Sequence, residues 1–167
     1  YVDFLKTCWD QWISSGYTGE AIPTIFPVRG FHQDRIPDDI DGKLGYYALA
    51  AETSITAGTW QAAQAAAAIA QTGQQRISNG ASETFALCRP PGHHASSNQF
   101  GGYCFLNNAA IAAQGMLTDG ATKVAILDID FHHGNGTQSI FYDRDDVLFV
   151  SLHGNPNDAF PHFLGYV

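Results

Sequence analysis

The first segment of the chain has the periodicity of an amphipathic helix. Residues 2–14 carry Leu5, Cys8, Trp9 and Trp12 at intervals of three and four positions. This interval places the four side chains on one face of a helix, where they can be buried together. We therefore predict a helix over 2–14 with one apolar face.

Further helices and one long loop are predicted downstream. The Ala-rich range 46–71 favours two consecutive helices, with Thr59 as the N-cap of the second, because a threonine hydroxyl can accept a hydrogen bond from the first turn. Residues 107–117 predict another helix. The range 19–42 contains three prolines and no hydrophobic period, so we predict a long ordered loop there, which in a compact domain is often functional.

Three short apolar runs predict strands. They cover residues 84–88, 123–129 (KVAILDI) and 147–152 (VLFVSL), and the first is followed closely by two prolines. The KVAILDI run is apolar at successive positions, as strands of a parallel sheet are when helices cover both faces. Strands that alternate with helices indicate an α/β fold, a parallel sheet between helical layers, with ligands bound beyond the carboxyl ends of the strands.

Composition and charge limit the classes of function. The 167 residues are 45% hydrophobic, enough for one domain or a piece of one, and the ends at Tyr1 and Val167 predict a segment of something longer. A formal charge of -8 disfavours nucleic acid and favours a small cationic molecule or a basic peptide. Three scattered cysteines predict a reducing compartment, by default the cytoplasm, and no apolar run predicts a membrane span.

Candidate chemistry begins at the end of the KVAILDI run. Asp128, Asp130 and His132 alternate along the chain there, so a strand period would aim all three to one side. A catalytic zinc takes three protein ligands and keeps an open position, and Asp130 and His132 would supply two of the three. The alternative is a polar loop that caps the next helix. A carboxylate as deep in an apolar strand as Asp128 needs a cation or strong donors, which argues for the metal.

Two other clusters add candidate groups. His93 and His94 follow the run that ends near Cys88, so they belong at the same edge of the sheet, where they could exchange protons with a reacting centre. Without context a structural pair of histidines is as good an explanation. Gly101 and Gly102 would let the backbone approach a ligand closely and the Tyr103 that follows them would form a wall, although core packing of Tyr103 and Phe105 explains the motif equally well.

Taken together, the motifs RPPGHHA, GGYCFLNNAA and ILDIDFHHGNGTQ resemble the histone deacetylase family. The flanks, among them FLKTCWDQW, GYYALAAET and SLHGNP, are similar to its bacterial acetylpolyamine amidohydrolase branch, and the resemblance covers essentially the whole chain. It implies the arginase-deacetylase fold and hydrolysis of an N-acetyl amide on a cationic amine. It also implies that residues 1–167 are the central part of a single deacetylase domain with both ends of the domain missing, so the chain alone is expected to be inactive or nearly so.

The resemblance assigns roles residue by residue. It implies Asp130 and His132 as zinc ligands, His93 and His94 as the tandem catalytic histidines, and Asp128 as the partner of the first of them. Asn135 stands where many members have an aspartate beside the second histidine, so His94 should favour its charged form less.

The remaining roles concern structural cations and substrate. For structural potassium the resemblance implies Asp128, Ser151, Leu152 and the carbonyls of Asp130 and His132, and at a second ion the carbonyls of Phe141, Arg144 and Val147. For substrate binding it implies Gly102, Tyr103, Phe160, Asp41 and Glu52, the last two as acids near the tunnel mouth.

Two alternatives stay open at the level of the sequence. The substrate is either an acetylated polyamine, which the flanks favour, or acetyl-lysine on a protein. The chain is either part of an active enzyme or a truncated, non-catalytic piece of one. Residues 17–45 resemble an inserted loop that in this branch reaches a second subunit, which predicts a homodimer.

Overall fold

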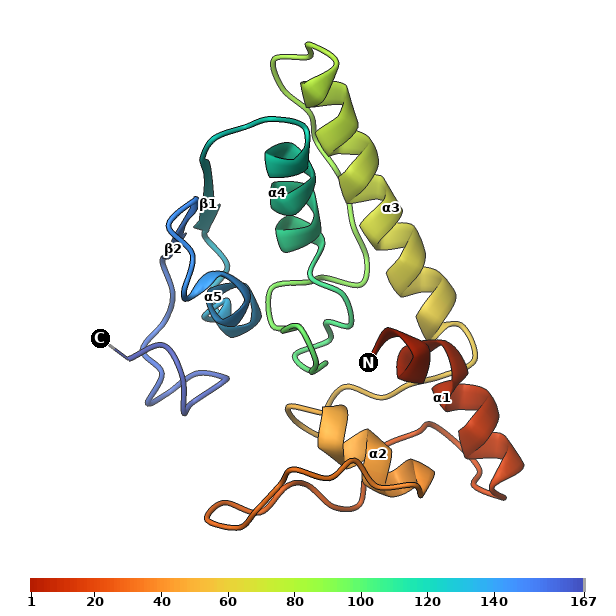
Figure 1. Ribbon diagram of the computed structural model, residues 1–167. Coiled ribbons are helices and arrows are strands. Elements are labelled where there is room, and N and C mark those ends of the chain that lie inside the picture. Colours follow the sequence, from red (N-terminus) through yellow and green to blue (C-terminus); the bar gives the residue numbers. More distant parts are fainter. Residues whose placement is uncertain (167) are drawn as a thin grey trace.

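The computed structural model describes residues 1–166, which form helices around a short parallel sheet (Figure 1). The elements in chain order are α1 (Val2–Ser14), α2 (Ile40–Tyr47), α3 (Thr59–Ser78), α4 (Asn108–Thr118), β1 (Val124–Asp128), α5 (Asn135–Phe141) and β2 (Val147–Ser151). Helix α4 lies between α3 and the two strands, whereas α1 and α2 lie together at the other end of the molecule. The predicted α/β class is confirmed.

Helix α1 confirms the prediction from periodicity. Leu5, Cys8 and Trp12 are buried on one face, as expected, together with Phe4, while Trp9 is partly buried against the same core. Trp12 also stacks on Tyr17, with ring centroids 3.9 Å apart. Burying one large apolar side chain contributes about 1.5–3 kcal/mol, so this face is enough to fix a helix that has no side-chain N-cap.

The predicted helix boundaries between 40 and 71 are wrong in part. Helix α2 begins at Ile40, inside the predicted loop, because the Asp39 side chain accepts hydrogen bonds from the first-turn backbone and caps the helix. It ends at Tyr47, where the backbone pairs instead with Phe100. In α3 the N-cap is Gly58, and Thr59 is the first helical residue.

Strands β1 and β2 form a parallel pair, with Val124 opposite Val147 and Asp128 opposite Ser151. The strands predicted over 123–129 and 147–152 are therefore confirmed to within one residue at each end. Alternate side chains of the pair face α4 and α5 and join a small apolar core there. The other face is open among residues 1–166, where Leu127 is 63% exposed. The described residues thus supply one of the two predicted helical layers.

The predicted strand over 84–88 is wrong, because this segment forms no backbone ladder in the described part of the chain. It follows α3, where Thr84 and Cys88 donate to backbone carbonyls of the helix. A groove of about 720 Å³ lies between this segment and β1. Apolar sequence alone selects an extended chain, but a strand also needs a neighbour for its N–H and C=O groups.

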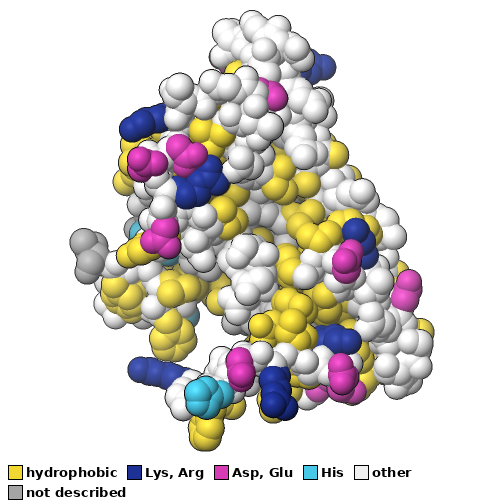
Figure 2. Space-filling model, viewed as in Figure 1, with side chains coloured by type: hydrophobic (Ala, Val, Ile, Leu, Met, Phe, Trp, Pro, Cys, Tyr) yellow, Lys and Arg dark blue, Asp and Glu magenta, His cyan; other side chains and the backbone are white. Residues whose placement is uncertain are grey.

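Apolar side chains interrupt much of the polar surface in Figure 2. Phe85 is 88% exposed, and Leu127, Leu148 and Leu152 each expose more than half of their area. No helix among residues 1–166 is both long and apolar enough to cross a membrane. Contiguous exposed apolar area of this kind marks a surface that another element or molecule covers.

Residues 1–167 made alone are therefore expected to bind the dye ANS, because the open face of the sheet offers an apolar surface to it. Replacing Leu127 and Leu148 together by threonine should lower the dye fluorescence and leave the far-ultraviolet circular dichroism unchanged. Dye fluorescence no greater than that of a compact globular protein would contradict this description of the surface.

Candidate active site

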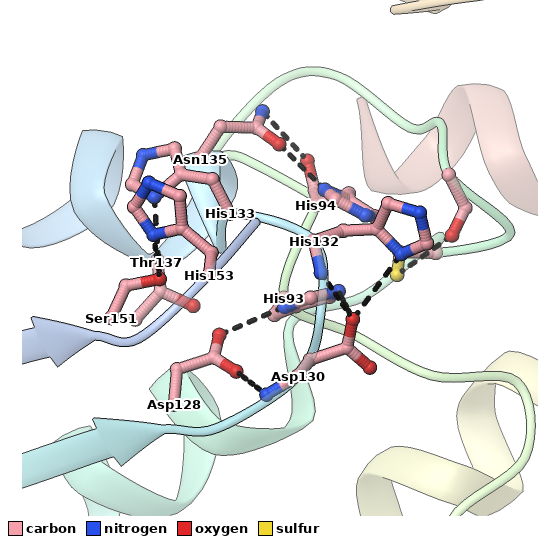
Figure 3. A network of polar contacts seen from close by, with 12 residues as sticks. His93, His94, Asp128, Asp130, His132, His133, Asn135, Thr137, Ser151 and His153 are labelled. Atoms are coloured by element: carbon pink, nitrogen blue, oxygen red, sulfur yellow. Dashed lines mark hydrogen bonds and ion pairs between the residues drawn. The ribbon is translucent and has the colours of Figure 1, made fainter. Parts of the chain in front are cut away.

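The site begins with the turn that follows β1. The Asp128 carboxylate accepts a hydrogen bond from the Asp130 N–H at 3.1 Å, and the Asp130 carboxylate accepts one from the His132 N–H at 2.8 Å. Each acid thus folds the chain back on itself by bonding the backbone two residues on. As a result Asp130 Oδ1 and His132 Nδ1 lie 3.3 Å apart and face the same space (Figure 3). The predicted convergence of these side chains is confirmed.

Asp128 joins this turn to the loop that carries the tandem histidines. His93 Nδ1 donates to Asp128 Oδ2 at 2.8 Å, and His93 Nε2 lies 3.9 Å from Asp130 Oδ1. Burial raises the pKa of Asp128, but the hydrogen bonds from His93 and the Asp130 N–H outweigh it and leave the pKa below its ordinary value. Asp128 is therefore ionised and fixes the ring of His93.

His94 has a different environment from its neighbour. It is 3% exposed, and its Nδ1 lies 2.7 Å from Asn135 Oδ1, which can only accept a hydrogen bond. Nδ1 therefore carries the proton, and Nε2 keeps a lone pair that can accept one. Burial, reinforced by the proximity of His93, lowers the pKa of His94 to about 4, although the bond to Asn135 acts in the opposite direction. The two adjacent histidines thus have a carboxylate and an amide as partners.

One wall of the site is built from Gly102 and Phe160. Gly102 has φ of 55°, and a Cβ there would lie 2.1 Å from Cδ2 of His94, so only glycine fits against that ring. The Phe160 ring meets His94 edge to face with centroids 4.8 Å apart and lies 6.3 Å from His132. Of the two predicted aromatic walls, Phe160 therefore borders the histidines, as does Gly102, for which a close backbone approach was predicted.

Other predicted substrate residues make different contacts. The Asp41 carboxylate is bonded by the backbone and hydroxyl of Thr24, and Glu52 accepts from the Gly102 N–H at 2.8 Å. Tyr103 is 64% exposed and points away from the core. Binding of substrate by these three residues stays a prediction.

Two histidines near Ser151 were not predicted as site residues from the sequence. Its hydroxyl lies 2.8 Å from His153 Nδ1 and 3.3 Å from His133 Nδ1, and the two imidazole centroids are 4.5 Å apart. His153 follows Ser151 by two positions at the end of β2, a spacing that could have signalled the contact. The potassium role of Ser151 and its predicted partners stays a prediction.

Metal donors are present but incomplete. Among residues 1–166 no group of three or more His, Cys, Asp or Glu side chains could hold a metal. Asp130 and His132 are the converging pair in the described site, as predicted, and a complete catalytic site would need a further ligand.

The contrast between the two histidines can be measured. Asn135→Asp should raise the pKa of His94 from its value of about 4, because a carboxylate stabilises the imidazolium and an amide does not. Titration of ¹⁵N-labelled histidines by NMR checks this, with Asn79→Asp, which adds the same charge at the exposed C-cap of α3, as the matched control. An unchanged His94 titration in Asn135→Asp would refute the assigned pairing.

Comparison with known proteins places this geometry in context. The family model of the histone deacetylase domain matches residues 1–167. The chain is 61% identical over 166 residues to an acetylpolyamine amidohydrolase of Mycoplana ramosa, covering 99% of this chain and 48% of that protein. It is 48% identical over 109 residues to histone deacetylase 8 of Arabidopsis thaliana, covering 64% of this chain and 29% of that one.

A solved structure has the same fold as the chain. The fold superimposes on the crystal structure of an acetylpolyamine aminohydrolase from Burkholderia pseudomallei with a TM-score of 0.90 at 40% identity, over 99% of this chain and 48% of that one. The chain thus spans about half the length of the curated relatives it matches. Its motifs, its fold and the matched family model show that the chain belongs to the histone deacetylase family.

Proposed function

We propose that the protein is a zinc-dependent amidohydrolase that removes acetyl groups from acetylated polyamines. The observation that carries this proposal is the convergence of Asp130 and His132 beside the His93–Asp128 and His94–Asn135 pairs. Membership of the family supports a metal-dependent deacetylase, and the 61% identity to an acetylpolyamine amidohydrolase supports the polyamine.

The donor geometry supports zinc. Two ligands at about 2.0–2.1 Å from a tetrahedral zinc lie about 3.3 Å from each other. The separation of Asp130 Oδ1 and His132 Nδ1 is 3.3 Å. When bound, zinc would polarise the acetyl carbonyl and lower the pKa of an attacking water.

The chain's own residues divide the proton transfers. His94 is neutral at neutral pH with Nε2 free, so it can accept a proton from the attacking water. His93, oriented by Asp128, directs Nε2 toward Asp130 and can deliver a proton to the departing amine. Gly102 and Phe160 border this space on the side of His94.

We further propose a structural potassium ion at Asp128, Ser151 and Leu152. Asp128 and Ser151 are register partners, and the Leu152 N–H donates to the Asp128 carbonyl, so the three residues meet at the carboxyl end of the sheet. A second ion at the carbonyls of Phe141, Arg144 and Val147 rests on the resemblance alone.

We also propose that the protein is cytoplasmic and forms a homodimer. The free cysteines, two of them buried, suit the reducing cytoplasm. Exposed apolar residues of the loop before α2, including Phe31, Val28 and Ile25, suit contact with a second subunit in a homodimer.

The substrate is tested by comparing acetylputrescine with an acetyl-lysine peptide on the zinc-loaded full-length protein. A higher kcat/KM for acetylputrescine is expected, because the chain carries a formal charge of -8 and two relatives, 61% and 55% identical to it, are acetylpolyamine amidohydrolases by name. A preference for the peptide would favour the alternative that the match to a plant histone deacetylase supports. Cleavage of neither would overturn the proposed function.

Gly102 provides a second test of the site. Gly102→Ala should lower kcat by about 100-fold, because the new methyl group would displace the His94 ring and a misplacement of about 1 Å costs on that order. Gly19→Ala is the matched control, since Gly19 also has a positive φ but no atom within 4 Å of the added Cβ. Equal activity of the two variants would show that the contact with His94 is irrelevant to the reaction.

A further inference from the structure

Two consecutive residues at the wall of the site have left-handed backbones. Gly102 has φ of 55° and Tyr103 has φ of 64°. The conformation is readily adopted by glycine and disfavoured for a tyrosine, so something must hold it in place. Within the turn, Gly101 and Cys104 exchange backbone hydrogen bonds of 3.0 and 2.9 Å. Those bonds close the turn but leave the N–H groups of its two central residues to other partners.

Both N–H groups are bonded by two neighbouring side chains from the loop between α2 and α3. The Gly102 N–H donates to Glu52 Oε1 at 2.8 Å, and the Tyr103 N–H donates to the Thr53 hydroxyl at 2.8 Å. The Thr53 hydroxyl in turn donates to Glu52 Oε1 at 3.0 Å. Glu52 Oε1 and the Thr53 hydroxyl therefore accept one backbone N–H each, and Glu52 Oε1 also accepts the Thr53 O–H. Thr53 is only 2% exposed, so its hydroxyl has no competing bulk water.

The clamped turn rests directly on a reacting group. Gly102 packs so closely on His94 that a Cβ would lie 2.1 Å from Cδ2 of the ring. Any shift of the turn is therefore felt at His94, which the proposed function makes the proton acceptor. The same turn presents Tyr103 to solvent beside a hollow of about 490 Å³ that Glu52 and Thr53 also line.

We propose that Glu52 and Thr53 are positioning residues, which clamp the Gly102–Tyr103 turn against His94 and thereby set the geometry of the reaction. This inference rests on the proposed deacetylase function for its kinetic consequence. It gives Glu52 a role that depends on its Oε1 as an acceptor, in addition to the predicted attraction of a cationic substrate by its charge.

Four variants separate the acceptor role from the charge role. Glu52→Ala removes both the acceptor and the charge, whereas Glu52→Gln removes the charge and keeps a carbonyl oxygen in place. Thr53→Val removes the hydroxyl and keeps the shape, whereas Thr53→Ser keeps the hydroxyl. Ser54→Ala is the matched control, because it deletes a neighbouring hydroxyl whose partner is Glu20 rather than the turn.

The variants are assayed in the zinc-loaded full-length protein with N-acetylputrescine and with its neutral analogue N-pentylacetamide. Glu52→Ala and Thr53→Val are expected to lower kcat on both substrates by about 10²-fold, the order of loss for a misplaced catalytic group, with little change in KM. Glu52→Gln and Thr53→Ser should recover most of that loss, and Ser54→Ala should match the unaltered protein.

Other outcomes overturn the inference. If Glu52→Gln is as damaging as Glu52→Ala on N-acetylputrescine, harmless on N-pentylacetamide, and Thr53→Val has no effect, Glu52 acts through its charge alone. Unchanged kcat in both Glu52→Ala and Thr53→Val would also refute the clamp. Glu52 is exposed, so Glu52→Ala remains decisive even if Thr53→Val fails to fold.

Hydrogen exchange distinguishes failure of the clamp from failure of the proposed function. The Gly102 and Tyr103 amides should be protected in the unaltered protein and exchange at least about tenfold faster in Glu52→Ala and Thr53→Val, with protection restored in Glu52→Gln. If the unaltered protein cleaves neither substrate, the proposed function is wrong and these exchange rates alone decide the clamp. Equal exchange rates in all variants would end the inference.

Discussion

The bond between Asp128 and His93 is the interaction on which the site depends. Asp128 lies at the carboxyl end of β1 and His93 follows the extended segment after α3, so one 2.8 Å hydrogen bond joins two parts of the chain that share no backbone ladder in the described residues. The same carboxylate accepts the Asp130 N–H and so turns Asp130 and His132 toward the histidines. Gly134 lets the following loop pass close by, since a Cβ there would lie 2.3 Å from Asp128 Oδ2. The site is therefore organised around one partly buried charge whose donors come from both loops.

The two adjacent histidines differ in their chemistry because their hydrogen-bond partners differ. His93 has an ionised carboxylate as its partner, while His94 is buried and has the neutral amide of Asn135. Burial of an imidazole without a countercharge disfavours its charged form, which is why His94 stays neutral well below physiological pH. Two groups of one residue type thus become distinct through their neighbours, as general acid–base catalysis requires.

Much of this site was predictable from the sequence, and the reasons are physical. The period of two after an apolar strand predicted that Asp128, Asp130 and His132 lie at one edge of the sheet. The helical spacing of apolar residues predicted the buried face of α1. The resemblance then identified His94 and Asn135 as neighbours, which no local pattern contains because they are distant in sequence.

Two features that the sequence did not predict depend on contacts between distant segments, and a third depends on a local cap. The segment 84–88 has the composition of a strand, but hydrogen-bonding partners decide whether a strand forms, and none is present among the described residues. The start of α2 was set by the Asp39 cap rather than by apolar spacing. The role of Thr53 could not be predicted because its partner, the Tyr103 N–H, lies fifty residues away in the sequence.

In the proposed function, Asp130 and His132 hold one divalent metal beside two histidines that do not bind it. Metal content of the purified full-length protein and its variants, measured by inductively coupled plasma mass spectrometry, tests this most directly. We expect one zinc per chain in the unaltered protein and in His94→Asn, and loss of the metal in Asp130→Ala and in His132→Ala. Full retention of zinc in both of the latter variants would contradict it.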